Sequence, residues 1–213
     1  ALMTRRFSQI TEITKLMEEC QSMNIKTLGP DINESYRAFG VNEHGEIRFG
    51  LSAIKGMGAP AADAIVAERE KNGAYKDIFD FAQRVDFSNV NRKAFESLAL
   101  SGGFDSFGIP REDFFAKDSK GNVFLDTLVK YGQLYQREQQ EAVTSLFGGE
   151  EAVEIATPPI PKGEPWSSIE KLNKERELVG IYLSAHPLDD YSIVLHSMCN
   201  TPVSYTHLTL PTN

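Results

Sequence analysis

The pattern of apolar and polar positions predicts a mixed start to the chain. Between residues 8 and 23, apolar side chains recur at steps of three and four, which is typical of one face of an amphipathic helix. A short apolar run over 25–28 predicts a strand that ends in a turn. The segments 36–41 and 46–50 flank a turn sequence at 42–45, and this arrangement predicts a β-hairpin.

From residue 51 onward the strand pattern gives way to helices. We expect helices over 59–72, 77–85 and 123–144, and another that is capped by Ser88 or Asn89 and ends before Gly102. Residues 148–165 hold four prolines and little periodicity, which indicates an extended linker. A last helix is expected to start at Ser167 or Ser168 and to be broken at His186-Pro187. The predicted fold class is mainly α with a small β-hairpin near the N-terminus (α+β).

Composition and charge narrow the function classes. The 213 residues include 22 basic and 30 acidic side chains, a formal net charge of −8, and 41% apolar residues. This apolar content excludes wholesale disorder, and no apolar run approaches the ~20 residues of a membrane-spanning helix. The acidic balance argues against a broad basic groove for nucleic acid. Two distant cysteines, Cys20 and Cys199, indicate a reducing compartment, so we expect a cytoplasmic protein without a zinc site or other bound cofactor.

One stretch carries the pattern of a helix-hairpin-helix motif. In the segment 51–66, an apolar residue precedes Lys55-Gly56-Met57-Gly58-Ala59, and small and apolar residues follow at helical spacing. The two glycines are expected to permit the tight turn with positive φ, and Met57 to point inward. The backbone N–H groups of Gly56, Gly58 and Ala59, with Lys55 beside them, would then bind a phosphate at the positive end of a helix. The alternative is a tight turn with no ligand.

A weaker second copy of this motif is expected further along the chain. The helix around 91–100 is followed by Gly102, Gly103 and Phe104, which would frame a second hairpin. Arg92 and Lys93 lie beside it and are candidate phosphate contacts. Paired hairpins would grip both strands of a duplex across the minor groove. The alternatives are a Gly-Gly loop between packed helices and ordinary solvated charges.

Taken together, five segments resemble the alpha subunit family of the bacterial replicative DNA polymerase III, a C-family polymerase. These segments are Gly29–Ser35, Gly50–Gly58, Asn91–Leu98, Ser101–Asp105 and Glu175–Leu188. The resemblance covers about residues 5 to 202. It implies a fragment of a DNA-directed DNA polymerase that serves in DNA replication and binds duplex DNA without sequence preference.

The resemblance also implies a division of the chain. Residues 1–49 would be the C-terminal end of the fingers domain, and 50–147 the tandem helix-hairpin-helix domain that binds DNA and the clamp. A Pro/Gly/acidic linker would occupy 148–165, and 166–202 would be a helical segment that leads to an OB-fold outside this chain. Residues 203–213 depart from the family, and we expect them to be a non-native or disordered tail.

Partners and catalytic groups follow from the same resemblance. The expected partners are duplex primer-template DNA, the sliding clamp (beta subunit), and the rest of the alpha chain and its holoenzyme, with no membrane. Leu146 and Phe147 would anchor the clamp, although Val143 stands where family members often carry Gln; a plain helix end explains the same residues equally well. The two Mg²⁺ ions of the polymerase would lie in a palm domain before residue 1, so this fragment alone is not expected to be an enzyme.

Two other functions fit the motif. One is a stand-alone helix-hairpin-helix adaptor of DNA repair, which also binds DNA but does not belong to a polymerase. The other is a protein–protein interaction module in which the hairpins pack on protein and bind no DNA. A titration with duplex DNA at low and high salt would separate the second possibility from the first.

Overall fold

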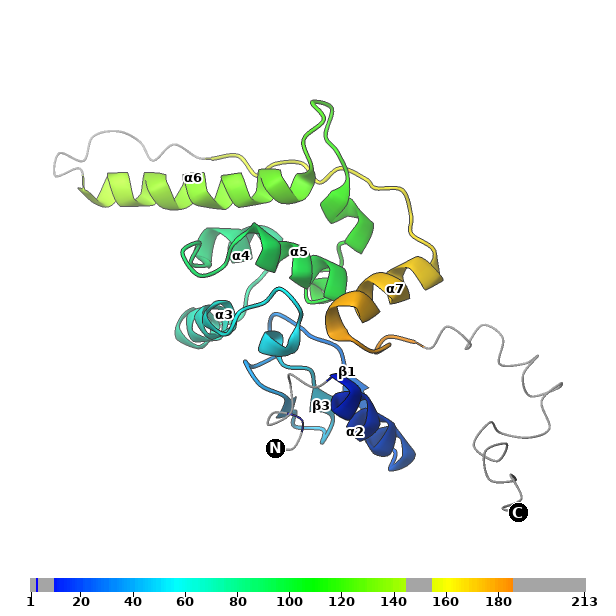
Figure 1. The fold of residues 1–213 in the computed structure, drawn as a ribbon. Coiled ribbons are helices and arrows are strands. Elements are labelled where there is room, and N and C mark those ends of the chain that lie inside the picture. Colours follow the sequence, from blue (N-terminus) through cyan, green and yellow to red (C-terminus); the bar gives the residue numbers. More distant parts are fainter. Residues whose placement is uncertain (1–2, 4–9, 145–154, 186–213) are drawn as a thin grey trace, which may run out of the picture.

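The computed structural model describes residue 3, residues 10–144 and residues 155–185 of the chain. Six α-helices and a three-stranded sheet lie within these ranges, together with three 3₁₀ turns, so the expected mainly α class with a small β part is confirmed (Figure 1). The α-helices are α2 (Ile10–Ser22), α3 (Ala59–Asn72), α4 (Ile78–Arg84), α5 (Arg92–Ser101), α6 (Phe124–Thr144) and α7 (Ser168–Val179). The strands are β1 (Thr27–Leu28), β2 (Gly40–Val41) and β3 (Ile47–Arg48), and the 3₁₀ turns are η1 (Leu51–Ala53), η2 (Asp105–Phe107) and η3 (Arg111–Phe115).

The small sheet contains the predicted hairpin and one more strand. β2 and β3 pair antiparallel, and β1 pairs parallel with the other side of β3, so the order is β1-β3-β2. The hairpin turn is held by the Asn42 side chain, whose oxygen accepts hydrogen bonds from the backbone N–H groups of His44 and Glu46. Each strand has only two residues, so the sheet depends on its contacts with the helices.

The helices match the sequence pattern well, with one correction at α5. Helix α3 has the predicted bounds, and Asp77 caps α4 by accepting hydrogen bonds from two backbone N–H groups. The cap of α5 is Asn91, whose side chain accepts from the N–H of Ala94, and not Ser88 or Asn89 as expected. Those two residues instead donate hydrogen bonds to the carboxylate of Asp86, which closes a turn before the helix begins.

The core is built largely from aromatic side chains of the helical part. Phe81, Phe95, Phe104 and Phe114 are all buried, and their ring centroids lie 5.1–6.4 Å apart in the contacts that they make. Helix α6 approaches α4 closely at Gly132, where a Cβ atom would overlap the backbone of Ala82.

Helix α7 is shorter than the sequence predicts. It ends at Val179, because Gly180 adopts the left-handed conformation (φ 86°) and its N–H bonds back to the carbonyl of Arg176. The expected continuation to the break at His186 is therefore wrong as far as residue 185, and His186 itself lies outside the described residues. Residues 155–166, which overlap the predicted linker over 148–165, lead into α7 without helix or strand. This segment is fastened to η3 where the N–H of Gly163 donates to Asp113.

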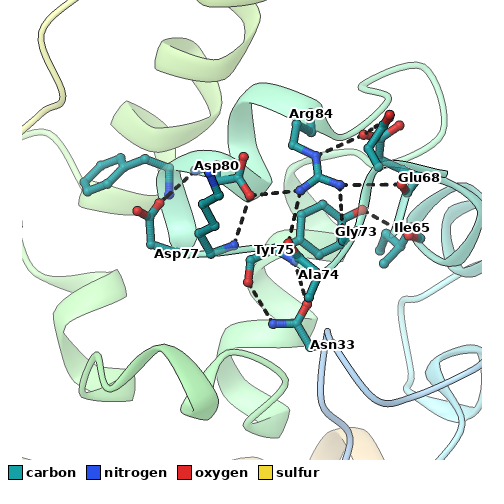
Figure 2. A network of polar contacts seen from close by, with 12 residues as sticks. Asn33, Ile65, Glu68, Gly73, Ala74, Tyr75, Asp77, Asp80 and Arg84 are labelled. Atoms are coloured by element: carbon teal, nitrogen blue, oxygen red, sulfur yellow. Dashed lines mark hydrogen bonds and ion pairs between the residues drawn. The ribbon is translucent and has the colours of Figure 1, made fainter. Parts of the chain in front are cut away.

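The segment before residue 50 packs on α3 and on the turn that follows it. The buried Arg69 side chain donates hydrogen bonds to the carbonyls of Ile32 and Ser35. Asn33 forms two hydrogen bonds with the backbone of Tyr75, whose ring lies under the guanidinium of Arg84 (Figure 2). The sheet region and the helices on either side of the predicted boundary at 49/50 therefore share one core.

Within the described ranges, no helix is long and apolar enough to cross a membrane. In the same part of the chain, no group of three or more His, Cys, Asp or Glu side chains is arranged to hold a metal ion.

Candidate nucleic-acid interface

The first hairpin joins η1 to α3. The first helix of the motif is reduced to the single 3₁₀ turn of η1, and the chain then reverses through Lys55, Gly56 and Met57 into the N-cap, Gly58. Met57 is buried, and its N–H closes the turn on the carbonyl of Ile54, as the inward-pointing prediction requires. The turn therefore has a fixed apolar side and an exposed backbone side.

The exposed side presents backbone donors without partners. Among the described residues, none accepts a hydrogen bond from the N–H groups of Gly56, Gly58, Ala59 or Ala61, and Pro60 has no N–H. The N-cap is a glycine and supplies no side-chain acceptor. These donors lie at the positive end of a 14-residue helix, which is the arrangement that binds phosphate oxygens.

The two glycines of the hairpin have different roles. Gly56 has φ +90°, and a Cβ atom there would lie 2.6 Å from the Ser97 hydroxyl, so the fold requires glycine at this position. Gly58 has φ −74° and ψ 155°, and a Cβ atom there would meet only the Pro60 ring at 3.5 Å. The expectation that both glycines supply positive φ is therefore wrong for Gly58. Glycine at 58 leaves space in front of the unpaired N–H groups.

Two lysines flank these donors. Lys55 precedes Gly56 and is exposed, and Lys93 on α5 extends across the hairpin so that its Cε lies 3.3 Å from the position of a Cβ at Gly56. Neither lysine forms an ion pair with any residue that the structure describes. The sequence groups Lys93 with the second hairpin, but the fold places it at the first.

Arg92, the neighbour of Lys93, is engaged within the protein. Its guanidinium contacts the carboxylate of Asp126 on α6 and that of Glu96 on its own helix, each at 2.6 Å. The hydrogen bond to Asp126 and the charges of both carboxylates raise the pKa of Arg92. Arg92 therefore ties α5 to α6 and is less available for phosphate than the two lysines.

The expected second hairpin has a different structure from the first. Gly102 is the left-handed C-cap of α5, and the N–H groups of Gly102 and Gly103 both donate to the carbonyl of Leu98. Phe104 is 1% exposed and lies in the aromatic core. The turn that follows, η2, has only three residues. Because all three residues are buried and the N–H groups of both glycines are used, this prediction of a DNA-contacting hairpin is corrected to a buried helix end.

Arg111 explains why the second hairpin is covered. Its guanidinium lies over Gly102 and forms ion pairs with Asp105 (2.5 Å) and with Glu175 of α7 (3.0 Å). Burial works to lower the pKa of Arg111, but the hydrogen bonds and charges of these two carboxylates outweigh it and raise the pKa. The sequence around Gly102 contains no pattern that predicts these contacts of Arg111.

Two further residues contact the first hairpin and are not predicted from the sequence. The Ser97 hydroxyl donates to the carbonyl of Lys55 (3.0 Å), and the carbonyl of Leu178 accepts from the N–H of Lys55 (2.9 Å). The helical periodicity of α5 places Ser97 on the inward face, but no local signal names its partner. The predicted clamp anchors, Leu146 and Phe147, lie outside the described residues.

Comparison with known proteins supports the assignment of a helix-hairpin-helix motif. Residues 24–114 match the family described as a helix-hairpin-helix motif. The chain is 37% identical over 195 residues to the DNA polymerase III subunit alpha of Pasteurella multocida, 40% over 195 residues to that of Chlamydia trachomatis, and 34% over 193 residues to that of Escherichia coli. These matches cover 89–90% of the chain. The chain is homologous to one segment of the DNA polymerase III alpha subunit.

The homologous segment is a small part of those proteins. The chain spans 15–16% of the length of the three alpha subunits. The matched family covers β1 to η3, which includes the first hairpin and its two lysines, and it ends before α6 and α7. The similarity to the alpha subunits extends further, because it covers about nine-tenths of the chain.

Proposed function

We propose that this chain is a segment of a replicative DNA polymerase alpha subunit that holds duplex DNA without reading its sequence. The N–H groups of Gly58, Ala59 and Ala61 would bind phosphate oxygens of one strand, and Lys55 and Lys93 would add charge on either side. The observation that carries the proposal is the row of unpaired N–H groups at the start of α3, with space in front of it. The homology to polymerase alpha subunits supports the choice of DNA and of replication.

The charge distribution limits how tightly the chain would bind by itself. Its net charge is −8, and only two unpaired lysines flank the hairpin within the described residues, so few phosphates would be neutralised. With about two phosphate neutralisations, log K would fall with log[salt] at a slope of about −2. We therefore expect weak, shallowly salt-dependent binding, and the main grip would come from other parts of the polymerase.

For the whole polymerase we propose the roles that the sequence resemblance implies. Nucleotide transfer with its two Mg²⁺ ions would take place in a palm domain outside this chain, in the cytoplasm. Tethering to the sliding clamp through Leu146 and Phe147 stays a prediction. In place of two DNA-contacting hairpins in tandem, we propose one hairpin, with Lys93 of α5 beside it.

The test uses Gly58→Val in a fluorescence anisotropy titration with duplexes of unrelated sequence. The backbone at Gly58 suits any residue and a Cβ atom there has space, so the variant is expected to fold while its side chain blocks the approach of a phosphate. Affinity should fall about tenfold or more and equally for all sequences, as expected when one charged hydrogen bond of about 1.5–3 kcal/mol is lost.

Gly29→Val is the matched control, because Gly29 also lacks positive φ and a Cβ atom added there would have no other atom within 4 Å. It should bind DNA as the original chain does. Equal affinity of Gly58→Val and Gly29→Val would refute the hairpin contact. Absence of duplex binding by the unmodified chain at low salt would instead favour a module that contacts protein.

A further inference from the structure

Lys55, at the base of the hairpin, is held through both its backbone N–H and its backbone carbonyl. The N–H of Lys55 donates to the carbonyl of Leu178, in the last turn of α7, at 2.9 Å. The carbonyl of Lys55 accepts from the Ser97 hydroxyl of α5 at 3.0 Å. Neither contact is local in sequence, since Ser97 and Leu178 lie 42 and 123 positions away. The shape of the turn is therefore set by two helices outside the hairpin.

This hold matters because the turn contains a glycine. Gly56 has a wide choice of backbone conformations when it is unconstrained, and only its observed φ of +90° directs the chain into α3 as seen. Fixing the preceding peptide removes much of that freedom before any ligand arrives. A donor array that is already in place binds more tightly than one that must be ordered on binding.

Helix α7 is itself locked in place by a buried carboxylate. Glu175 is 1% exposed and accepts hydrogen bonds from the N–H groups of Leu183 and Ser184, and its other oxygen pairs with Arg111 at 3.0 Å. Arg111 also pairs with Asp105, so the lock joins α7 to the end of α5. Removing one partner of such a buried pair leaves the other charge without compensation.

We propose that Ser97 and the C-terminal turn of α7 are positioning elements that hold the hairpin in its DNA-contacting shape. The DNA-contacting unit then includes α7, which lies beyond the region 24–114 that matches the helix-hairpin-helix family. This inference rests on the proposed function for its consequence in DNA binding, and on the contacts of Lys55 for its structural part. Movement of α7 would change DNA affinity although α7 contributes no phosphate donor at the hairpin.

The experiment follows the Lys55 amide by hydrogen exchange in the intact chain and measures duplex affinity by anisotropy under the same conditions. Ser97→Ala removes the hydroxyl, and Ser101→Ala is the control, since Ser101 is equally buried on α5 but donates to Leu98 of its own helix. Ser97→Ala should speed exchange at Lys55 and weaken duplex binding, each by about three- to tenfold, the worth of one hydrogen bond. Ser101→Ala should change neither.

A second pair of variants tests the lock on α7. Glu175→Gln weakens the buried pair with Arg111, whereas Glu170→Gln on the exposed face of α7 makes the same change in net charge. Exchange at Lys55 should rise in the first variant alone, and duplex affinity should fall in it relative to the second.

The outcomes separate the inference from the proposed function. Unchanged exchange at Lys55 in both Ser97→Ala and Glu175→Gln would overturn the positioning role. Faster exchange with unchanged duplex affinity would overturn its link to DNA binding. If the unmodified chain binds no duplex, the proposed function fails, and the exchange rates alone decide whether Ser97 and α7 hold the hairpin. Faster exchange in Ser97→Ala and not in Ser101→Ala would support that structural part.

Discussion

Phe104 provides the sharpest test of the corrected second hairpin. The sequence places it beside Gly102 and Gly103 as a candidate DNA contact, whereas the structure buries it. Its ring lies 5.2 Å from that of Phe81 and 5.5 Å from that of Phe114, centroid to centroid. At 1% exposure, the ring has no face for a nucleic-acid base. The two assignments predict opposite results when the ring is removed.

The expected cost of Phe104→Ala is large on the scale of this protein. Replacing a fully buried phenylalanine by alanine costs about 3–5 kcal/mol, because both the transfer free energy and the contacts around the cavity are lost. The surrounding rings are themselves buried between helices, so the site has little room to collapse. A domain of this kind has about 5–15 kcal/mol of stability in total. Phe104→Leu keeps most of the volume and should cost less than about 2 kcal/mol.

The assay combines urea unfolding, followed by far-ultraviolet circular dichroism, with duplex anisotropy on the leucine variant. Phe104→Ala should lower the midpoint strongly. Phe104→Leu should leave duplex affinity unchanged, against the loss of about 1–3 kcal/mol that follows when a base-stacking ring is removed. A Phe104→Ala variant that loses under about 1 kcal/mol, or a folded Phe104→Leu variant that loses DNA affinity, would refute the core assignment.

Three other variants test the backbone at two glycines and a buried hydroxyl. Gly56→Ala should lower the free energy of unfolding in urea by about 1–3 kcal/mol, because alanine disfavours positive φ and its Cβ atom would overlap Ser97. Gly108→Ala is the control: Gly108 has φ +72° but open space around it, so this variant should show the backbone cost alone. Equal losses in the two variants would show that the overlap with Ser97 costs nothing. Burial raises the pKa of Tyr75 well above 10, so the folded state keeps this proton when the unfolded state releases it, and stability should fall as the pH rises above about 10. Tyr75→Phe should flatten that alkaline fall in urea midpoints between about pH 8 and 11, and an unchanged slope would contradict the cause.

The features that local sequence predicts well are those with local causes. Helix α3 has its predicted bounds because a glycine and a proline mark its start and Asn72-Gly73 marks its end, all within the segment itself. The β-hairpin is likewise fixed by Asn42, whose side chain bonds to residues two and four positions later. The cap of α5 escapes prediction because Ser88, Asn89 and Asn91 have similar capping chemistry, and the choice depends on Asp86.

Only the part of the candidate site that has local causes is predictable from the sequence. The first hairpin is visible in the sequence because its glycines, Met57 and the start of α3 lie within one short stretch. The segment Gly102-Gly103 also contains two glycines after a predicted helix. Arg111 and α7, which lie later in the sequence, bury it in the fold. Lys93 is a candidate contact on sequence alone, yet its place beside Gly56 follows from packing that no spacing rule contains.

The dependence of the small sheet on the helices has a consequence for how the chain folds during synthesis. Arg69 supplies donors to the carbonyls of Ile32 and Ser35, which are 37 and 34 positions earlier, and Tyr75 supplies the backbone partners of Asn33. Strands of two residues do not persist alone, and these polar groups stay hydrated until their partners exist. The hydrogen bonds of Ile32, Asn33 and Ser35 with Arg69 and Tyr75 can therefore form only after α3 and the turn that follows it have left the ribosome.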